Sequence, residues 1–84
     1  MTYRDAVLFV QMQRRNIRKV SGIVIDHNGF QYRLTYKGGF AEFVAIDRRE
    51  IGKRNYKYFG GFGAYHCVSA EQVLKMAMEK IEAV

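Results

Sequence analysis

Residues 23–34 have the sequence Ile-Val-Ile-Asp-His-Asn-Gly-Phe-Gln-Tyr-Arg-Leu, with Asn28-Gly29 at the centre. Asn-Gly readily adopts the positive φ angles of a two-residue type I′ turn, so this segment predicts a β-hairpin with Ile25 opposite Tyr32. Because successive side chains of a strand point to opposite faces, one face is apolar and the other polar. The apolar face carries Ile23, Ile25, Phe30, Tyr32 and Leu34, and the polar face carries Asp26, Gln31, Arg33 and Thr35.

A glycine pair at 38–39 predicts another two-residue turn and a third strand over residues 40–46. That turn would place Leu34 opposite Phe43 and extend the apolar face, with Thr35 opposite Glu42 on the polar face. Three apolar residues would then lie among polar ones: Phe40, Val44 and Ile46. We expect that another element covers them or that they belong to an interface.

The last residues of the chain predict an amphipathic helix over 69–83. Ser69 and Gln72 have the spacing of a capping box, and Glu71 suits the positive end of the helix dipole. Apolar residues then recur at helical spacing: Val73, Leu74, Ala77, Ile81 and Val84, with Met78 beside them. We expect this stripe to pack on the apolar face of the sheet.

Residues 3–14 fit two interpretations. Thr2 and Asp5 have capping-box spacing, and a helical stripe follows at Tyr3, Ala6, Val7 and Val10. The apolar run 6–10 also suits a strand, although the helix is favoured. Further along, residues 55–59 and 64–68 predict two short strands around the glycines of 60–63.

These patterns predict one small basic α+β domain over residues 1–84. It combines an antiparallel β-meander of three to five strands with a C-terminal amphipathic helix on one face and an N-terminal helix. The longest apolar run, 6–10, is far too short to span a membrane, and we expect no signal peptide and no membrane partner. The expected location is the cytoplasm, whether of the protein's own cell or of a host cell.

Basic residues are concentrated in the middle of the chain. Residues 14–57 include eleven basic side chains and four acidic ones, which give this stretch a net charge of +7. The net charge of the whole chain is +6. Basic groups that meet phosphates, interleaved with rings that stack on bases, are typical of nucleic-acid-binding surfaces. The candidates form two clusters and a hairpin pair: Arg14, Arg15, Arg18 and Lys19; Arg48, Arg49, Lys53, Arg54 and Lys57; and Arg33 with Lys37. The binding hypothesis assumes that the two clusters meet on one side.

Three aromatic residues near these charges are candidate stacking groups: Tyr56, Tyr58 and Phe62. Phe62 belongs to the glycine-rich segment 59–65. It fits a ring that stacks on a base and a ring in the core equally well.

No pattern indicates catalytic residues, a metal site or a cofactor. His66 and Cys67 are adjacent, but neighbours in a strand point to opposite faces and would not converge as a nucleophile and base or as two metal ligands. We expect a buried Cys67 and a half-exposed His66. One cysteine forms no internal disulfide.

Three functions follow from these features. The first is a non-enzymatic module that binds nucleic acid with low sequence specificity through phosphate contacts. The second is a small phage- or plasmid-encoded protein that binds an acidic surface of a host enzyme or nucleic-acid-processing complex and inhibits it. The third is a minimal ribonuclease-type toxin that uses Arg48, Arg49, Tyr56 and His66. Homodimerisation, through an edge strand or through the face of Phe40, Val44 and Ile46, is a further alternative.

Overall fold

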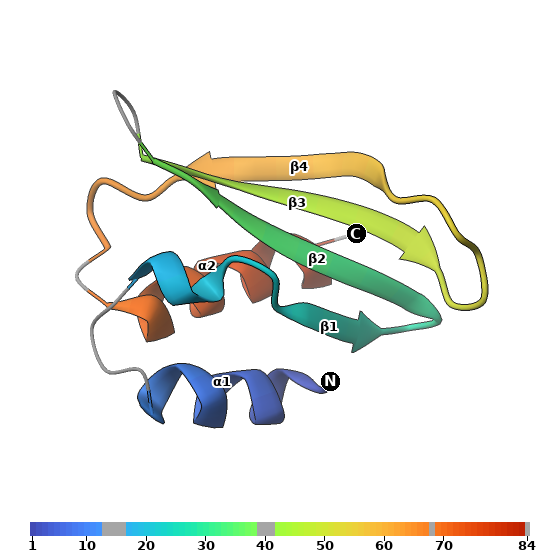
Figure 1. Cartoon of the computed structure of the whole chain (residues 1–84), viewed down its shortest axis with the longest axis horizontal. Coiled ribbons are helices and arrows are strands. Elements are labelled where there is room, and N and C mark those ends of the chain that lie inside the picture. Colours follow the sequence, from blue (N-terminus) through green and yellow to red (C-terminus); the bar gives the residue numbers. More distant parts are fainter. Residues whose placement is uncertain (13–16, 39–41, 68, 84) are drawn as a thin grey trace.

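A computed structural model of the chain describes residues 1–12, 17–38, 42–67 and 69–83 (Figure 1). Its elements are α1 (Tyr3–Met12), the 3-10 helix η1 (Ile17–Val20), β1 (Val24–His27), β2 (Phe30–Lys37), β3 (Phe43–Glu50), β4 (Lys57–Gly63) and α2 (Ala70–Glu82). The four strands form one antiparallel sheet in chain order. The expected α+β fold, a meander with a helix at each end, is confirmed.

The first hairpin has the predicted register. Ile25 lies opposite Tyr32, and Val24 lies opposite Arg33. The turn residues Asn28 and Gly29 have φ angles of 49° and 83°, which lie in the left-handed region that Asn-Gly favours. The apolar face predicted for this hairpin contributes four buried side chains to the core: Ile23, Ile25, Tyr32 and Leu34.

The register between β2 and β3 differs from the prediction by three residues. Leu34 lies opposite Ile46, because the connection between the strands is longer than a two-residue turn. An odd shift exchanges the two faces of a strand. Val44 and Ile46 therefore face the core and are fully buried, whereas Phe43 faces away from it. The polar face predicted for Val44 and Ile46 is wrong. Of the two alternatives for these residues, burial beneath other elements is the one that the structure has, and Phe40 lies outside the described residues.

The prediction of two short strands around Gly60–Gly63 is wrong, because β4 is a single strand that runs through these glycines. It includes residues 57–59 of the first predicted strand; residues 64–67 are not in a strand, and residue 68 lies outside the described residues. Gly60 lies opposite Ile46 but Tyr58 lies opposite Asp47, so Phe59 is an extra residue in a β-bulge. The bulge shifts the alternation of side chains by one residue. As a result Tyr58 lies on the same side of the sheet as Asp47, and Phe59 packs edge-to-face on buried Tyr32, with ring centroids 5.2 Å apart.

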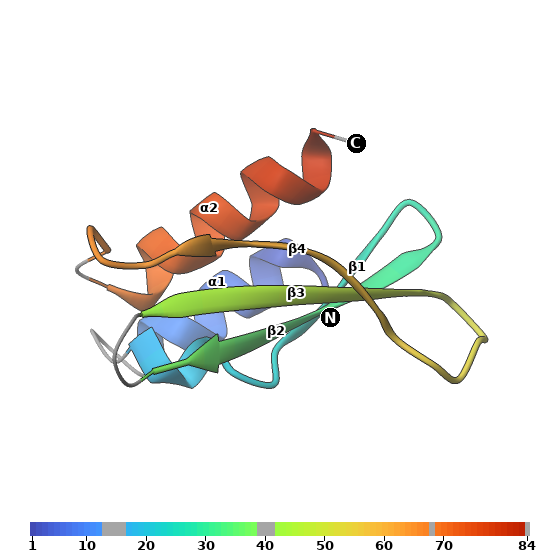
Figure 2. The same cartoon turned by 90° about the horizontal axis from the view of Figure 1, so that it is seen from above.

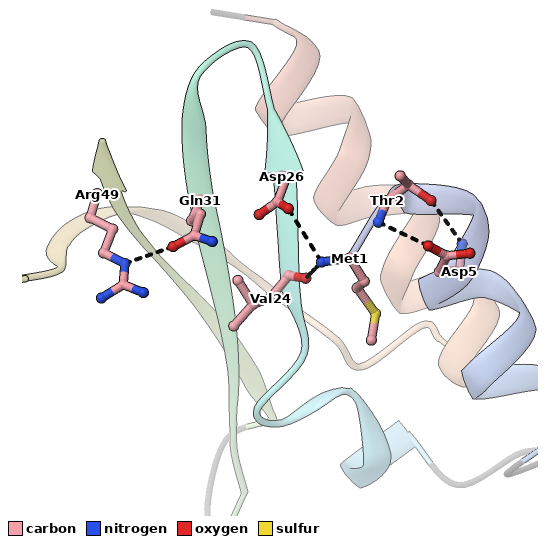
Figure 3. Close-up of polar contacts among 7 residues, drawn as sticks. All are labelled: Met1, Thr2, Asp5, Val24, Asp26, Gln31 and Arg49. Atoms are coloured by element: carbon pink, nitrogen blue, oxygen red, sulfur yellow. Dashed lines mark hydrogen bonds and ion pairs between the residues drawn. The ribbon is translucent and has the colours of Figure 1, made fainter. Parts of the chain in front are cut away.

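Both helices begin at the predicted caps. The Ser69 hydroxyl accepts a hydrogen bond from the Gln72 amide at 3.3 Å. The predicted stripe is buried at Val73, Leu74, Ala77 and Ile81, and Val84 lies outside the described residues. At α1, the Thr2 amide donates to the Asp5 carboxylate at 3.4 Å, and the Asp5 amide donates to the Thr2 hydroxyl at 3.2 Å (Figure 3). The helix favoured for residues 3–14 is confirmed over 3–12, and Ala6 and Val10 are its buried residues.

The helices cover one face of the sheet. The sheet passes in front of α2 in Figure 1, and α1 packs beside α2 and β1. A single core of buried residues lies between these layers and includes side chains from both helices, η1 and all four strands. We call the opposite side of the sheet the outer face; it carries Gln31, Arg33, Thr35 and Lys37 of β2, Phe43, Ala45, Asp47 and Arg49 of β3, and Tyr58 of β4.

The N-terminal residue extends the sheet edge at β1. The Asp26 amide donates to the Met1 carbonyl at 2.8 Å, and the terminal amine donates to the Val24 carbonyl at 3.1 Å (Figure 3). The terminal amine also lies 3.5 Å from the Asp26 carboxylate. These bonds occupy backbone groups on the free edge of β1.

Among the described residues, no helix is long and apolar enough to cross a membrane.

Candidate nucleic-acid interface

The connection between β3 and β4 forms a hollow of about 550 Å³ at one end of the sheet. We call it the basic hollow. Its lining contains every member of the basic cluster predicted at 48–57, together with one acidic residue and three others: Arg48, Arg49, Lys53, Arg54 and Lys57; Glu50; and Phe30, Asn55 and Tyr58. Five residues that are spread over ten positions of the sequence therefore surround one depression.

Backbone hydrogen bonds shape the loop that encloses the basic hollow. The Lys53 amide donates to the Glu50 carbonyl at 3.0 Å and closes a turn in which Gly52 has a φ of 96°. The Ile51 amide donates to the carbonyl of Gly29 at 3.0 Å, which ties the loop to the tip of the first hairpin. Cation-bearing side chains thus project from a turn that is anchored at two points.

Arg49 connects this loop to the outer face. Its Nε donates to Gln31 Oε1 at 2.8 Å (Figure 3), and one terminal nitrogen donates to the Arg54 carbonyl at 3.2 Å. The guanidinium carbon lies 4.4 Å from the centre of the Tyr56 ring, and that of Arg33 lies 4.2 Å from the same ring. The half-buried Tyr56 ring is thus occupied by two guanidinium groups, so we assign it an anchoring role in place of the predicted stacking role.

Arg48 lies on the other side of β3. Its guanidinium carbon is 4.5 Å from the centre of the Phe30 ring and 5.0 Å from that of Phe59. The side chain therefore lies along the rim of the aromatic core while its charge reaches the basic hollow. Phe30 was not among the predicted site residues, since its place on the apolar hairpin face indicated the core alone.

The ion pairs found among the described residues do not involve the basic side chains of the basic hollow. In the parts of the chain that the structure describes, no carboxylate forms an ion pair with any of its five basic residues. Arg33, outside the basic hollow, pairs with Asp47 at 3.2 Å. With five cations and Glu50 as its one acidic lining residue, the basic hollow is suited to an anion.

The structure places Arg18 and Lys19, the described part of the first basic cluster, away from the basic hollow. Arg18 and Lys19 lie on η1, next to the end of β2 where the Tyr36 amide donates to the Ser21 hydroxyl. The basic hollow lies at the opposite end of β2, and both views place η1 and the β3–β4 loop at opposite ends of the molecule (Figures 1 and 2). The assumption that the clusters meet is wrong for Arg18 and Lys19. Arg14 and Arg15 lie outside the described residues.

The remaining candidates fall in different places. Lys37 is exposed at the η1 end of β2. Phe62 is only 7% exposed and belongs to the core, so it is not available to stack on a base. His66 follows β4 at the end away from the basic hollow, and the seven residues of β4 span about 23 Å at about 3.3 Å per residue. His66 is therefore far from Arg48, Arg49 and Tyr56, and the residues of the predicted ribonuclease are not assembled.

Cys67 is half-buried, and its Sγ lies 3.4 Å from Met76 Sδ. Burial, and to a lesser extent the charge of Glu42, raises the pKa of the Cys67 thiol above its ordinary value. A raised pKa reduces the fraction of nucleophilic thiolate. The described residues contain no group of three or more His, Cys, Asp or Glu side chains that could hold a metal ion.

Comparison of the chain with family models, curated proteins and solved structures finds no match. We therefore infer function from the geometry of the chain itself. Its two informative features are the basic hollow and the outer face of the sheet.

Proposed function

We propose that the protein is a non-enzymatic module that binds nucleic acid with low sequence specificity through the phosphate backbone. The observation that carries this proposal is the convergence of five basic side chains on one hollow, whose described lining includes Glu50 as its single acidic residue. Arginines bind phosphate with paired N–H donors, and lysines bind it as point charges. Contacts of this kind recognise the backbone and not the base sequence.

The arrangement supports a specific division of roles within the basic hollow. Arg48 and Arg49 are fixed by aromatic rings and hydrogen bonds, so their guanidinium groups are held in place before a phosphate arrives. Lys53, Arg54 and Lys57 are exposed on the loop and the start of β4. We assign the fixed pair to positioning of one phosphate and the exposed residues to neighbouring phosphates.

Binding of short labelled oligonucleotides at low ionic strength tests the proposal. The diagnostic variant is Lys53→Glu/Arg54→Glu, because both side chains are exposed and their replacement leaves the core intact. The matched control is Lys75→Glu/Lys80→Glu, which reverses two exposed charges on α2 instead. We expect the loop variant to lose at least about tenfold in affinity, equal to about 1.4 kcal/mol, and the helix variant to lose much less.

Equal loss in the two variants would show that only the overall charge matters. Failure of the wild-type protein to bind either a single strand or a duplex at low salt would end the proposal.

A protein partner is the second candidate, and α1 carries the observation that favours it. Leu8, Phe9 and Met12 are exposed apolar residues on this helix. An apolar helix face surrounded by polar residues suits a protein interface. Retrieval of one stable partner from nuclease-treated lysate by the wild type, but not by Leu8→Lys/Met12→Lys, would support this function, and equal retrieval by both would exclude α1 as its site.

A further inference from the structure

The outer face of the sheet is shaped by glycines. A Cβ atom added to Gly61 would lie 2.8 Å from Cε1 of the Phe43 ring, and one added to Gly63 would lie 2.7 Å from Cε2 of Tyr65. Gly61 and Gly63 lie opposite Ala45 and Phe43, so both positions belong to the outer face. The two rings therefore lie directly against the bare backbone of β4 where side chains would otherwise project.

Three rings follow one another along the outer face. Tyr58, opposite Asp47, is 67% exposed, and Tyr65, against Gly63, is 63% exposed. Phe43 lies between them against Gly61 and is half-buried. The four residue-to-residue steps from Asp47 to Phe43 cover about 13 Å of β3 at about 3.3 Å per step. The described residues thus present a row of aromatic surfaces on a side of the sheet that the helices leave uncovered.

Positive charge accompanies this row on the neighbouring strand. Lys37 lies opposite Phe43, whereas the charge of Arg33 is paired with the Asp47 carboxylate at 3.2 Å. Arg49 follows on the same face and leads into the basic hollow, of which Tyr58 is also a lining residue. Two basic residues therefore lie at the two ends of the aromatic row, Lys37 opposite Phe43 and Arg49 at the basic hollow.

We propose that the outer face binds single-stranded nucleic acid. Successive bases stack on Tyr58, Phe43 and Tyr65, while the phosphates pass Lys37 and enter the basic hollow. The proposal rests on the proposed function and adds the strand type and the base-binding surface. Base–aromatic stacking requires exposed base faces, which a single strand offers and an intact duplex does not.

The experiment compares three labelled probes of equal phosphate number, about 16 nucleotides in length. They are an oligothymidylate, a hairpin duplex and an abasic strand that keeps the phosphates and lacks the bases. The protein variants are Tyr58→Ala and Tyr65→Ala, with Tyr58→Phe as the variant that keeps the ring. Phe9→Ala is the matched control, because Phe9 is an exposed ring on α1, away from the outer face.

We expect the wild type to bind oligothymidylate at least about fivefold more tightly than the abasic strand and the hairpin. Tyr58→Ala and Tyr65→Ala should each lose at least about fivefold on oligothymidylate and keep their affinity for the abasic strand. Tyr58→Phe and Phe9→Ala should bind like the wild type.

Equal affinity for all three probes, with both alanine variants unchanged and Lys53→Glu/Arg54→Glu weakened, would overturn the stacking surface and leave the phosphate-binding function in place. No binding of any probe would remove both. Sedimentation of the free protein tests whether a second copy of the chain binds this face instead. A dimer that dissociates in Tyr58→Ala would assign the outer face to self-association and overturn the proposal.

Discussion

Substitution of two adjacent glycines in β4 tests the arrangement of the outer face. A Cβ atom at Gly61 would lie 2.6 Å from the Val44 carbonyl oxygen as well as against the Phe43 ring, whereas one at Gly60 meets nothing within 4 Å. Neither glycine has a positive φ, so alanine is compatible with the backbone at both positions. Both replacements therefore share the same gain from a less flexible unfolded chain, about 0.4–1 kcal/mol.

The difference between Gly61→Ala and Gly60→Ala isolates the steric cost, which is about 1–3 kcal/mol for an overpacked site. For a domain of this size, each kcal/mol corresponds to about 4–8 °C in Tm. We expect the Tm of Gly61→Ala, measured by circular dichroism, to lie below the Tm of Gly60→Ala by the shift that corresponds to this steric cost. Equal Tm values for the two variants would refute the placement of Phe43 over Gly61.

A double-mutant cycle separates the two contacts at Gly61. Phe43→Ala removes the ring and leaves the Val44 carbonyl in place, so Gly61→Ala should cost less in this background without becoming neutral. We expect a coupling energy of at least about 0.5 kcal/mol. Absence of coupling would assign the whole cost to the backbone and would separate the ring from the glycine.

Three further predictions concern other parts of the chain. Leu74→Ala should destabilise the domain by about 2–5 kcal/mol in urea unfolding, because Leu74 is fully buried on α2; a loss below about 1 kcal/mol would contradict its place in the core. Ser69→Ala should cost about 0.5–2 kcal/mol in the same assay through loss of the α2 cap, and no change would contradict the cap. Alkylation of Cys67 by iodoacetamide near pH 8.5, about the ordinary pKa of a cysteine thiol, should be slower than alkylation of a free cysteine, because the pKa of Cys67 is raised. Glu42→Gln should accelerate the reaction. Identical rates for the wild type, this variant and the free thiol would contradict the raised pKa.

Local sequence signals were sufficient for the elements whose geometry is set by neighbouring residues. The Asn28-Gly29 turn determined the register of β1 and β2, since a two-residue loop permits one pairing. The caps at Thr2/Asp5 and Ser69 likewise defined the starts of α1 and α2, because each cap is a hydrogen bond between residues three positions apart. These predictions needed no information about the rest of the fold.

The register of β3 could not be obtained in this way. Its pairing depends on the length of the connection after Lys37, and a glycine pair does not show how many residues the loop uses. An error of three residues exchanged the faces of Val44 and Phe43. Val44, predicted on the polar face, is in the core, and Phe43, predicted on the apolar face, lies on the outer face. In β4, the bulge at Phe59 reverses the alternation of side chains, so the face of Tyr58 does not follow from counting residues along the strand. No local sequence pattern indicates the position of this bulge.

The candidate site was predicted in part. The cluster at 48–57 does line one hollow, because a short loop keeps sequence neighbours close together. Phe43 and Tyr65 were missed as site residues. Phe43 lies against Gly61, which is far from it in the sequence, and no sequence pattern indicates that the Tyr65 ring lies against Gly63. Two glycines at alternate positions of one strand, Gly61 and Gly63, were the available signal, but it becomes interpretable only when the strand is known to be continuous.

The salt dependence of binding to a single strand tests the central claim most directly. For oligothymidylate titrated between about 50 mM and 200 mM salt, the slope of log K against log salt is about −0.7 for each phosphate neutralised. We predict that the wild type binds with a clearly negative slope, that Lys53→Glu/Arg54→Glu makes this slope shallower by at least about 1.4, and that Lys75→Glu/Lys80→Glu leaves it nearly unchanged. A slope near zero, or the same slope in the wild type and the loop variant, would contradict phosphate binding in the basic hollow.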